Sequence, residues 1–330
     1  MKKWLLFLLK LVLTCACLWW AFAEVDIRST VLWHPERMHF GWLAAGLVLA
    51  GVTVLLSVVR WRVFLAAQGV EVSMRRALEL TLIGNFFSLM SVGGLASDAA
   101  RVLLLIREHP NRKLAVTISV MADHMSGMVG LVLLFYFFTV GRFEVLEAHS
   151  VLGRGVLRFA YVYLGCGLAV ILLGFLATSP LVHGRVHRGG RWVKWEFMRT
   201  VPEAWDTYRR KWPYALLGVA LACVMMLVYF LTFWCGAQAV GCGVSAGEVL
   251  SAMPVIDAIS SIPVSVSGIG VREKLFVILL GDLAAVEAEV AVSASLAGFL
   301  CHALWSLSGS VLFLMTHGEV TAREIEEYHG

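Results

Sequence analysis

The sequence predicts an all-α polytopic membrane protein with six transmembrane helices and two broken re-entrant helical segments, arranged as an inverted repeat of two halves. Three observations lead to this fold. The 330 residues are 59% hydrophobic and 15% charged, whereas soluble proteins are roughly 45–50% apolar and about 25% charged. Six apolar runs are long enough to cross a bilayer. Two further apolar segments are interrupted at matching places.

Each of the six apolar runs meets the length of about 20 residues that a helix needs to span the hydrocarbon core. They are residues 4–23, 40–59, 115–140, 156–178, 214–236 and 290–316. The first run follows Lys2 and Lys3 and ends in Ala21-Phe22-Ala23, so it also resembles a signal peptide. Because Lys10 interrupts its apolar stretch and the run is long enough to span, we predict an uncleaved helix.

The two interrupted segments are residues 77–106 and 247–281. The first is broken at Gly93 and Gly94, and the second by Pro254, Pro263 and the run that contains Gly268 and Gly270. Their charged residues are Asp98 and Arg101 in the first segment, and Asp257, Arg272, Glu273 and Lys274 in the second. Both breaks therefore lie next to ionisable side chains.

The second half of the chain repeats the first. Residues 91–95 align with residues 265–269, and the same offset of 174 places residue 40 on residue 214. We therefore predict a single integral membrane domain, residues 1–330, with one repeat half at 1–141 and the other at 156–317. Small-residue turns can also recur by chance in membrane proteins, which is the alternative to a repeat.

The distribution of Lys and Arg predicts the orientation, because cytoplasmic loops carry an excess of them. Residues 60–76, 107–113 and the basic loop 179–213 are rich in Lys and Arg, and we expect them in the cytoplasm. Residues 237–247 and 282–289 contain neither, and we expect them to face outward.

This orientation requires each broken segment to enter and leave on one side, the first from the cytoplasm and the second from outside. Each half then has three crossings, so the halves are inverted and both termini are cytoplasmic, including the tail 318–330. Inverted repeats with discontinuous helices at matching positions are typical of transporters, whose binding site lies near the bilayer midplane.

Ionisable side chains within the membrane are candidate functional residues, because they are costly there unless paired or hydrated. Asp98 and Arg101 are three apart, so they share a helix face and are predicted to pair. Arg272 and Glu273 are adjacent, which predicts that they address different partners. Asp123 and Asp257 are candidates for proton or ion coupling, and His124 and His302 are interpreted as packing histidines.

The breaks also suggest an anion site. Helix N-termini with exposed backbone N–H groups attract anions, and arginines bind phosphate through charge-assisted hydrogen bonds. The predicted substrate-binding residues are Asp98, Arg101, Arg272, Glu273, Gly93, Gly94, Gly268 and Gly270. They would bind a phospholipid headgroup or a lipid-linked phosphate. The alternative is that the charges form internal ion pairs that only hold the segments in place.

The sequence lacks the motifs that are typical of other functional classes. The seven cysteines include no C-x-x-C pattern and the histidines no paired metal-ligand spacing, so neither a metal nor a cofactor is predicted. No P-loop is present, so ATP hydrolysis is not expected. Basic residues lie between apolar runs rather than on one surface, which disfavours a nucleic-acid partner.

Residues 85–101, the Asp123-His124 pair and residues 262–273 resemble the lysylphosphatidylglycerol synthase transmembrane family, also called flippase-like or UPF0104. The most specific motif is Gly-Ile-Gly-Val-Arg-Glu at 268–273. The chain departs from the family at Val92, near its usual proline, and at His124, where the family has arginine.

The resemblance implies movement of a lipid between leaflets of the bacterial cytoplasmic membrane, with a phospholipid or a polyprenyl or hopanoid-type lipid as partner. In two-domain members the membrane module precedes a soluble aminoacyl-transferase domain. Residues 318–330 leave no room for one, so we expect no enzyme activity in this chain and a separate lipid-modifying enzyme as partner. The lipid, the direction, the energy source and the oligomeric state are left open.

Two other functions compete with lipid transport. A membrane-embedded transferase with a lipid-linked donor could use Glu24 or Asp26 as a general base. A non-transporting scaffold of a lipid or cell-envelope biosynthesis complex could bind anionic lipids or a cytosolic enzyme through the basic loop 179–213.

Overall fold

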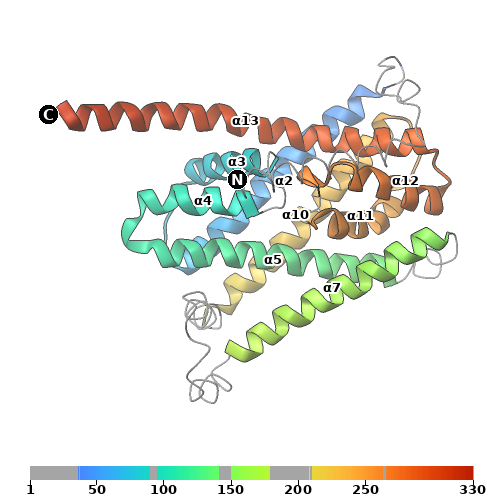
Figure 1. Cartoon of the computed structure of the whole chain (residues 1–330), viewed down its shortest axis with the longest axis horizontal. Coiled ribbons are helices and arrows are strands. Elements are labelled where there is room, and N and C mark those ends of the chain that lie inside the picture. The colour runs from blue at the N-terminus through green and yellow to red at the C-terminus, as the bar shows by residue number, and fades with distance from the viewer. Residues whose placement is uncertain are drawn as a thin grey trace, which may run out of the picture.

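The computed structural model describes residues 36, 38–89, 95–140, 150–178, 208, 210–262 and 265–329, and this part of the chain is helical (Figure 1). The helices are α2 Phe40–Ala67, α3 Met74–Leu89, α4 Leu95–Glu108, α5 Lys113–Val140, α7 Val151–Thr178, α10 Trp212–Ala239, α11 Ala246–Ser260, α12 Val271–Ala284 and α13 Ala288–His329. Short 3-10 turns, Pro110–Arg112 and Val266–Gly268, precede α5 and α12.

Five of these helices are long and apolar enough to cross a membrane. They are α2, α5 with the turn before it, α7 over Val151–Ala169, α10, and α13 over Ala288–Met315. Each coincides with one of the predicted apolar runs, which confirms a multi-pass membrane protein. Large apolar side chains such as Leu55, Phe137 and Leu314 lie exposed on these helices, as lipid-facing residues do. The predicted run 4–23 lies outside the described residues.

Both interrupted segments consist of two short helices. The first gives α3 and α4, which are separated between Leu89 and Leu95. The second gives α11 and α12, separated between Ser260 and Val271. The prediction that Pro254 contributes to the second break is wrong, because it lies buried inside α11. Packing against neighbouring helices lets a proline remain inside a helix of a membrane protein.

The helices form two sets of four in the same order, and the first three helices of each set have nearly equal lengths. The first set, α2 to α5, has helices of 28, 16, 14 and 28 residues. The second set, α10 to α13, has helices of 28, 15, 14 and 42 residues. This order is what the predicted repeat requires. The repeat itself, the boundaries of its halves and their inverted orientation stay predictions.

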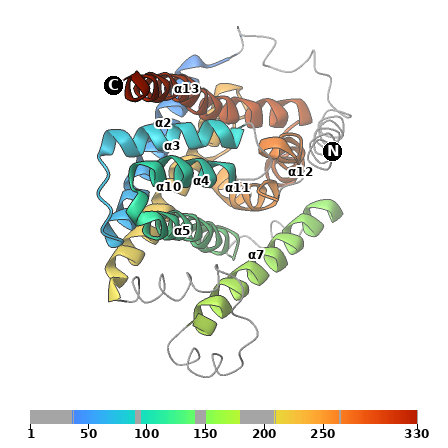
Figure 2. The same cartoon turned by 60° about the vertical axis from the view of Figure 1, so that its left-hand side comes forward.

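The two sets interlock rather than lie side by side. α2 packs along α10, α3 packs on α13, and α11 packs on α5. Figure 2 shows α13, α3, α4 and α5 in successive layers, with α11 and α12 beside them. At the crossing of α10 and α13, a Cβ atom on Gly236 would lie 2.5 Å from the backbone nitrogen of Gly298. The two backbones approach this closely because both positions are glycine.

The end of α2 differs from its prediction. Arg60 and Arg62 were assigned to a cytoplasmic loop, but α2 continues to Ala67 and Arg60 is buried. The helix continues because Arg60 has an ion-pair partner inside the protein, Asp123. Lys211 Nζ donates to the Ala67 carbonyl at 2.7 Å and so caps the last turn of α2.

Candidate functional site

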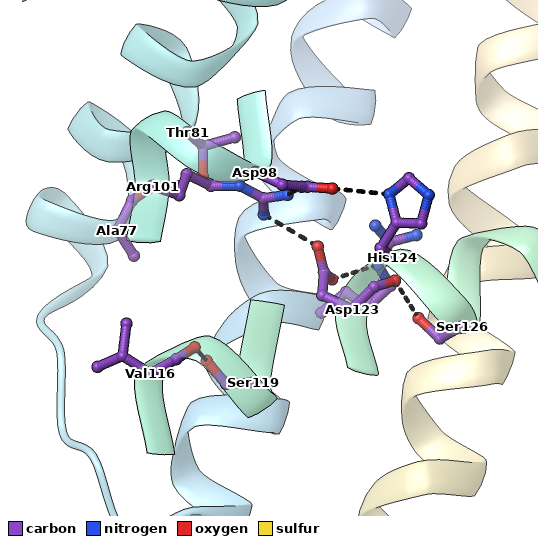
Figure 3. Close-up of polar contacts among 10 residues, drawn as sticks. Ala77, Thr81, Asp98, Arg101, Val116, Ser119, Asp123, His124 and Ser126 are labelled. Atoms are coloured by element: carbon purple, nitrogen blue, oxygen red, sulfur yellow. Dashed lines mark hydrogen bonds and ion pairs between the residues drawn. The ribbon is translucent and has the colours of Figure 1, made fainter. Parts of the chain in front are cut away.

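A cluster of five ionisable side chains from three helices lies beside the first break (Figure 3). We call it the first-half cluster; it comprises Arg60 of α2, Asp98 and Arg101 of α4, and Asp123 and His124 of α5. Asp123 lies at its centre. One carboxylate oxygen accepts from Arg60 Nε at 2.7 Å and the other from Arg101 Nη1 at 2.9 Å.

The cluster continues through Asp98. Its carboxylate accepts from Arg101 Nη2 at 2.5 Å and pairs with His124 Nδ1 at 2.7 Å. This confirms the predicted pairing of Asp98 with Arg101. His124 is an ion-pair partner, so its interpretation as a packing histidine is wrong.

Exposure of the first-half cluster rises from one end to the other. The side chain of Asp123 is 0% exposed, that of Arg101 7%, that of Asp98 16% and that of His124 40%. The ring of Trp61 lies 5.1 Å from the Arg101 guanidinium carbon, a cation–π contact on the closed side. The cluster is therefore closed at Asp123 and open at His124.

A second cluster lies directly after the second break. This second-half cluster comprises Arg272 and Glu273 of α12 and Ser295 of α13. Glu273 Oε1 accepts from Arg272 Nη2 and from Ser295 Oγ, both at 3.0 Å. Glu273 Oε2 accepts from the backbone N–H of Gly270 at 2.5 Å. The prediction of different partners for Arg272 and Glu273 is wrong, because the arginine side chain is long enough to fold back onto its neighbour.

Aromatic rings and burial close the second-half cluster. The side chains of Arg272 and Glu273 are 6% and 0% exposed. The Arg272 guanidinium carbon lies 4.2 Å from the centre of the Phe299 ring. A buried pair with this many partners is satisfied without a ligand.

The second break contacts the end of α3. Ser267 Oγ donates to the carbonyls of Leu89, at 3.0 Å, and Ser88, at 3.2 Å. These are the last residues of α3, whose carbonyls lack partners within the helix. Ser267 has φ 51° and Gly268 has φ 72°, so the turn that presents this hydroxyl is left-handed. The structure thus brings the second break to the helix end that precedes the first break.

Asp257 belongs to a third polar group, which lies near Arg272 of the second-half cluster. Tyr229 of α10 donates its hydroxyl proton to Asp257 Oδ1 at 3.2 Å. The ring of His302 of α13 lies 4.8 Å from that of Tyr229. Of the two predicted coupling residues, Asp123 is therefore at the centre of the first-half cluster and Asp257 pairs with a tyrosine.

Sequence reasoning missed three participants, Arg60, Ser295 and Tyr229. Arg60 could have been found, because Asp123 lies inside a predicted span and needs a basic partner. Arg60 directly follows the apolar run that ends at Val59, so a longer α2 would supply that partner. Ser295 and Tyr229 carried no signal, because single hydroxyl residues are common in apolar helices. The predicted Gly93 and Gly94 lie outside the described residues. In the described ranges, no three or more His, Cys, Asp or Glu residues form a group that could hold a metal ion.

Comparison with known proteins identifies the family. The family profile described as "Lysylphosphatidylglycerol synthase TM region" matches residues 7–309. The chain belongs to this family. An archaeal relative, a UPF0104 membrane protein of Pyrococcus horikoshii, is 24% identical over 181 residues, which are 54% of this chain and 50% of the relative. The chain thus spans about half the length of the curated relative that it matches. The family resemblance expected from the sequence is confirmed.

Proposed function

We propose that the protein moves a phospholipid or a lipid-linked phosphate between membrane leaflets, through a site where its two broken segments meet. One observation carries the proposal. His124 lies near the middle of the membrane-spanning helix α5, pairs with Asp98 of α4, and has a side chain that is 40% exposed. An exposed ionisable pair at this depth is costly in hydrocarbon, so it faces water or a lipid headgroup.

The re-entrant arrangement has support in the first broken segment. Arg76 at the start of α3 pairs with Glu108 at the end of α4, with Nη2 and Oε1 2.6 Å apart. α3 and α4 therefore form a hairpin whose two ends lie together. The ends of this hairpin carry Arg75, Arg76 and Arg107, whereas the corresponding ends of α11 and α12 carry Glu248 and Asp282. By the positive-inside rule, this charge difference favours opposite orientations of the two hairpins.

The proposed site uses residues from both breaks. Asp98 and Arg101 of the first segment, with Arg272, Glu273, Gly268 and Gly270 of the second, are the proposed substrate-binding residues. Both arginines are already paired, so a phosphate would share their remaining N–H groups or replace a carboxylate. Arg60 Nη1 and Arg101 Nε are buried without a hydrogen-bond partner among the described residues, so the first-half cluster has unused donors.

Asp123 and Asp257 are proposed for proton or ion coupling. Asp123 is a buried carboxylate, and Asp257 is a partly buried one that accepts a hydrogen bond from Tyr229. If protons drive movement, an imposed pH gradient changes the rate of lipid movement in vesicles. A rate that is the same with and without the gradient would rule out proton coupling.

The test of the proposed function is fluorescent-lipid translocation in proteoliposomes across several headgroups. We expect the wild type to move at least one anionic lipid, and Arg272→Ala and Asp98→Asn to lose that movement at equal reconstitution. Arg272→Lys keeps the positive charge and separates loss of a contact from loss of folding. Glu287→Gln, at an exposed position, is the control. Absence of movement for every lipid would contradict the proposal.

The transferase and scaffold alternatives receive no support from the described residues. Glu24 and Asp26 lie outside them, as does most of the basic loop 179–213. The structure thus bears on neither alternative. We propose a non-enzymatic role in a bacterial cytoplasmic membrane, with both termini in the cytoplasm and a separate lipid-modifying enzyme as partner.

A further inference from the structure

The tautomer of His124 follows from its contact with Asp98. A carboxylate oxygen accepts hydrogen bonds, so Nδ1 of His124, 2.7 Å from Asp98 Oδ2, carries a proton. The other ring nitrogen, Nε2, has no hydrogen bond to the described residues and is not among the buried unpartnered atoms. The open atom of the first-half cluster is therefore Nε2 of His124.

The charges of the cluster determine what this atom binds. The carboxylates of Asp98 and Asp123 balance the guanidinium groups of Arg60 and Arg101. When the His124 ring is neutral, Nε2 is an acceptor and the cluster carries no net charge. When the ring is an imidazolium, Nε2 becomes a donor and one positive charge is uncompensated at the exposed end.

We propose that the His124 imidazolium binds a phosphate oxygen of the translocated lipid through Nε2. A phosphate brings the compensating negative charge and accepts a charge-assisted hydrogen bond. This proposal rests on the proposed function, since it assigns a headgroup contact within the same site. It makes His124 a binding residue and a phosphate-bearing lipid the ligand class.

The proposal predicts phosphate binding that weakens as pH rises. The charged groups facing the ring are Asp98 and Arg101 from α4, Arg60 from α2 and Asp123 from α5 itself. From α11, which also packs on α5, Asp257 is held by Tyr229. Deprotonation of the ring removes the uncompensated positive charge and turns Nε2 into an acceptor.

The test is equilibrium binding by calorimetry to the detergent-purified full chain at about pH 5.5 and about pH 8, the two ends of the range in which histidine serves as a charge switch. The ligands are short-chain phosphatidylglycerol, short-chain diacylglycerol and inorganic phosphate. We expect phosphatidylglycerol to bind about tenfold more weakly at the higher pH, the size of change that one lost charge-assisted hydrogen bond gives. Diacylglycerol lacks the phosphate and should show no such pH dependence.

Variants assign the effect to the ring. His124→Gln should bind phosphatidylglycerol weakly at both pH values, and His124→Arg should bind it at both, because its charge is permanent. His109→Gln, a histidine at the turn between α4 and α5, should behave as the wild type. Retained pH dependence in His124→Gln would overturn the proposal, as would equal binding of diacylglycerol.

The experiment distinguishes a lipid headgroup from free phosphate as the ligand. It also distinguishes the proposed headgroup site from the proposed lipid transport. Binding of inorganic phosphate with the same pH dependence, but not of phosphatidylglycerol, would overturn the lipid assignment. Binding of phosphatidylglycerol through His124 without any translocation in vesicles would support the headgroup site and contradict the proposed transport.

Discussion

The first-half and second-half clusters both keep an arginine buried beside a carboxylate at the start of a helix that follows a break. They differ in what closes them. Around Glu273, the acceptors are filled by Arg272, Ser295 and a backbone N–H, and an aromatic ring covers the guanidinium. The first-half cluster ends in a histidine that is 40% exposed.

Both clusters belong to the proposed site, but this difference gives them different weights: the second-half cluster mainly holds the packing of that site, and the first-half cluster offers it an open contact. A buried ion pair whose partners are all satisfied stabilises a particular packing, and breaking it mainly affects folding. An ion pair with an open end can change its charge or accept a ligand without unfolding the protein. A substitution of Asp123 should therefore mainly lower the stability of the fold. A substitution of His124 should mainly change ligand binding.

The largest expected effect is that of Asp123→Asn. It leaves two buried guanidinium groups without their shared carboxylate, and removal of one partner from a buried pair costs about 3–5 kcal/mol. Thermal unfolding in detergent, followed by tryptophan fluorescence, measures the loss. Arg60→Gln combined with Asp123→Asn should recover part of it, because the charges balance again. Strictly additive losses would show that Arg60 and Asp123 do not interact.

Glu273→Gln should cost slightly less, about 3 kcal/mol, the lower end of the range for a broken buried pair. The amide oxygen can still accept one of the hydrogen bonds that Glu273 receives, but Arg272 loses its counter-charge. The same unfolding measurement applies, with exposed Glu287→Gln as the matched control. A loss equal to that of the control would mean that the second-half cluster is not an anchor.

Ser267→Ala should destabilise by about 1 kcal/mol, the usual contribution of one hydrogen bond. The alanine keeps the left-handed conformation and loses the contact with the end of α3. Ser267→Gly loses the same contact, but glycine adopts positive φ without strain, so it should be the more stable of the two. Chemical unfolding of both variants compares them, and an alanine variant as stable as the glycine variant would argue against strain at this position.

The smallest effect on stability should be that of His124→Gln, below about 1 kcal/mol, because partly exposed ion pairs contribute little. Its unfolding temperature should stay close to that of the wild type even though phosphate binding changes. A loss as large as that of Asp123→Asn would place His124 among the anchoring residues and remove the contrast between the two ends.

The sequence predicted the features that local patterns encode. Apolar runs specify spans, and small residues with prolines mark the second break, although Pro254 is accommodated inside α11. The pairing of Asp98 with Arg101 followed from helical spacing alone. These predictions need no knowledge of which helices meet.

Features that depend on tertiary contacts were not predicted. Arg60 was assigned to a loop because the apolar run ends at Val59, and the local pattern does not identify its partner, Asp123, on another helix. The pairing of Arg272 with Glu273 depends on the path of one side chain, which spacing does not define. The contact of Ser267 with Leu89 joins residues far apart in the chain, and only the packing of the two sets of helices brings them together.

The packing of α3 on α13 has a consequence for biosynthesis. A ribosome completes α3 and α4 long before it begins α13, and membrane segments leave it in chain order. The first hairpin must therefore wait in the bilayer without the helix that covers it in the finished protein. A chain that stops before α13 leaves the face of α3 that α13 covers exposed to lipid and to the proteases of membrane quality control.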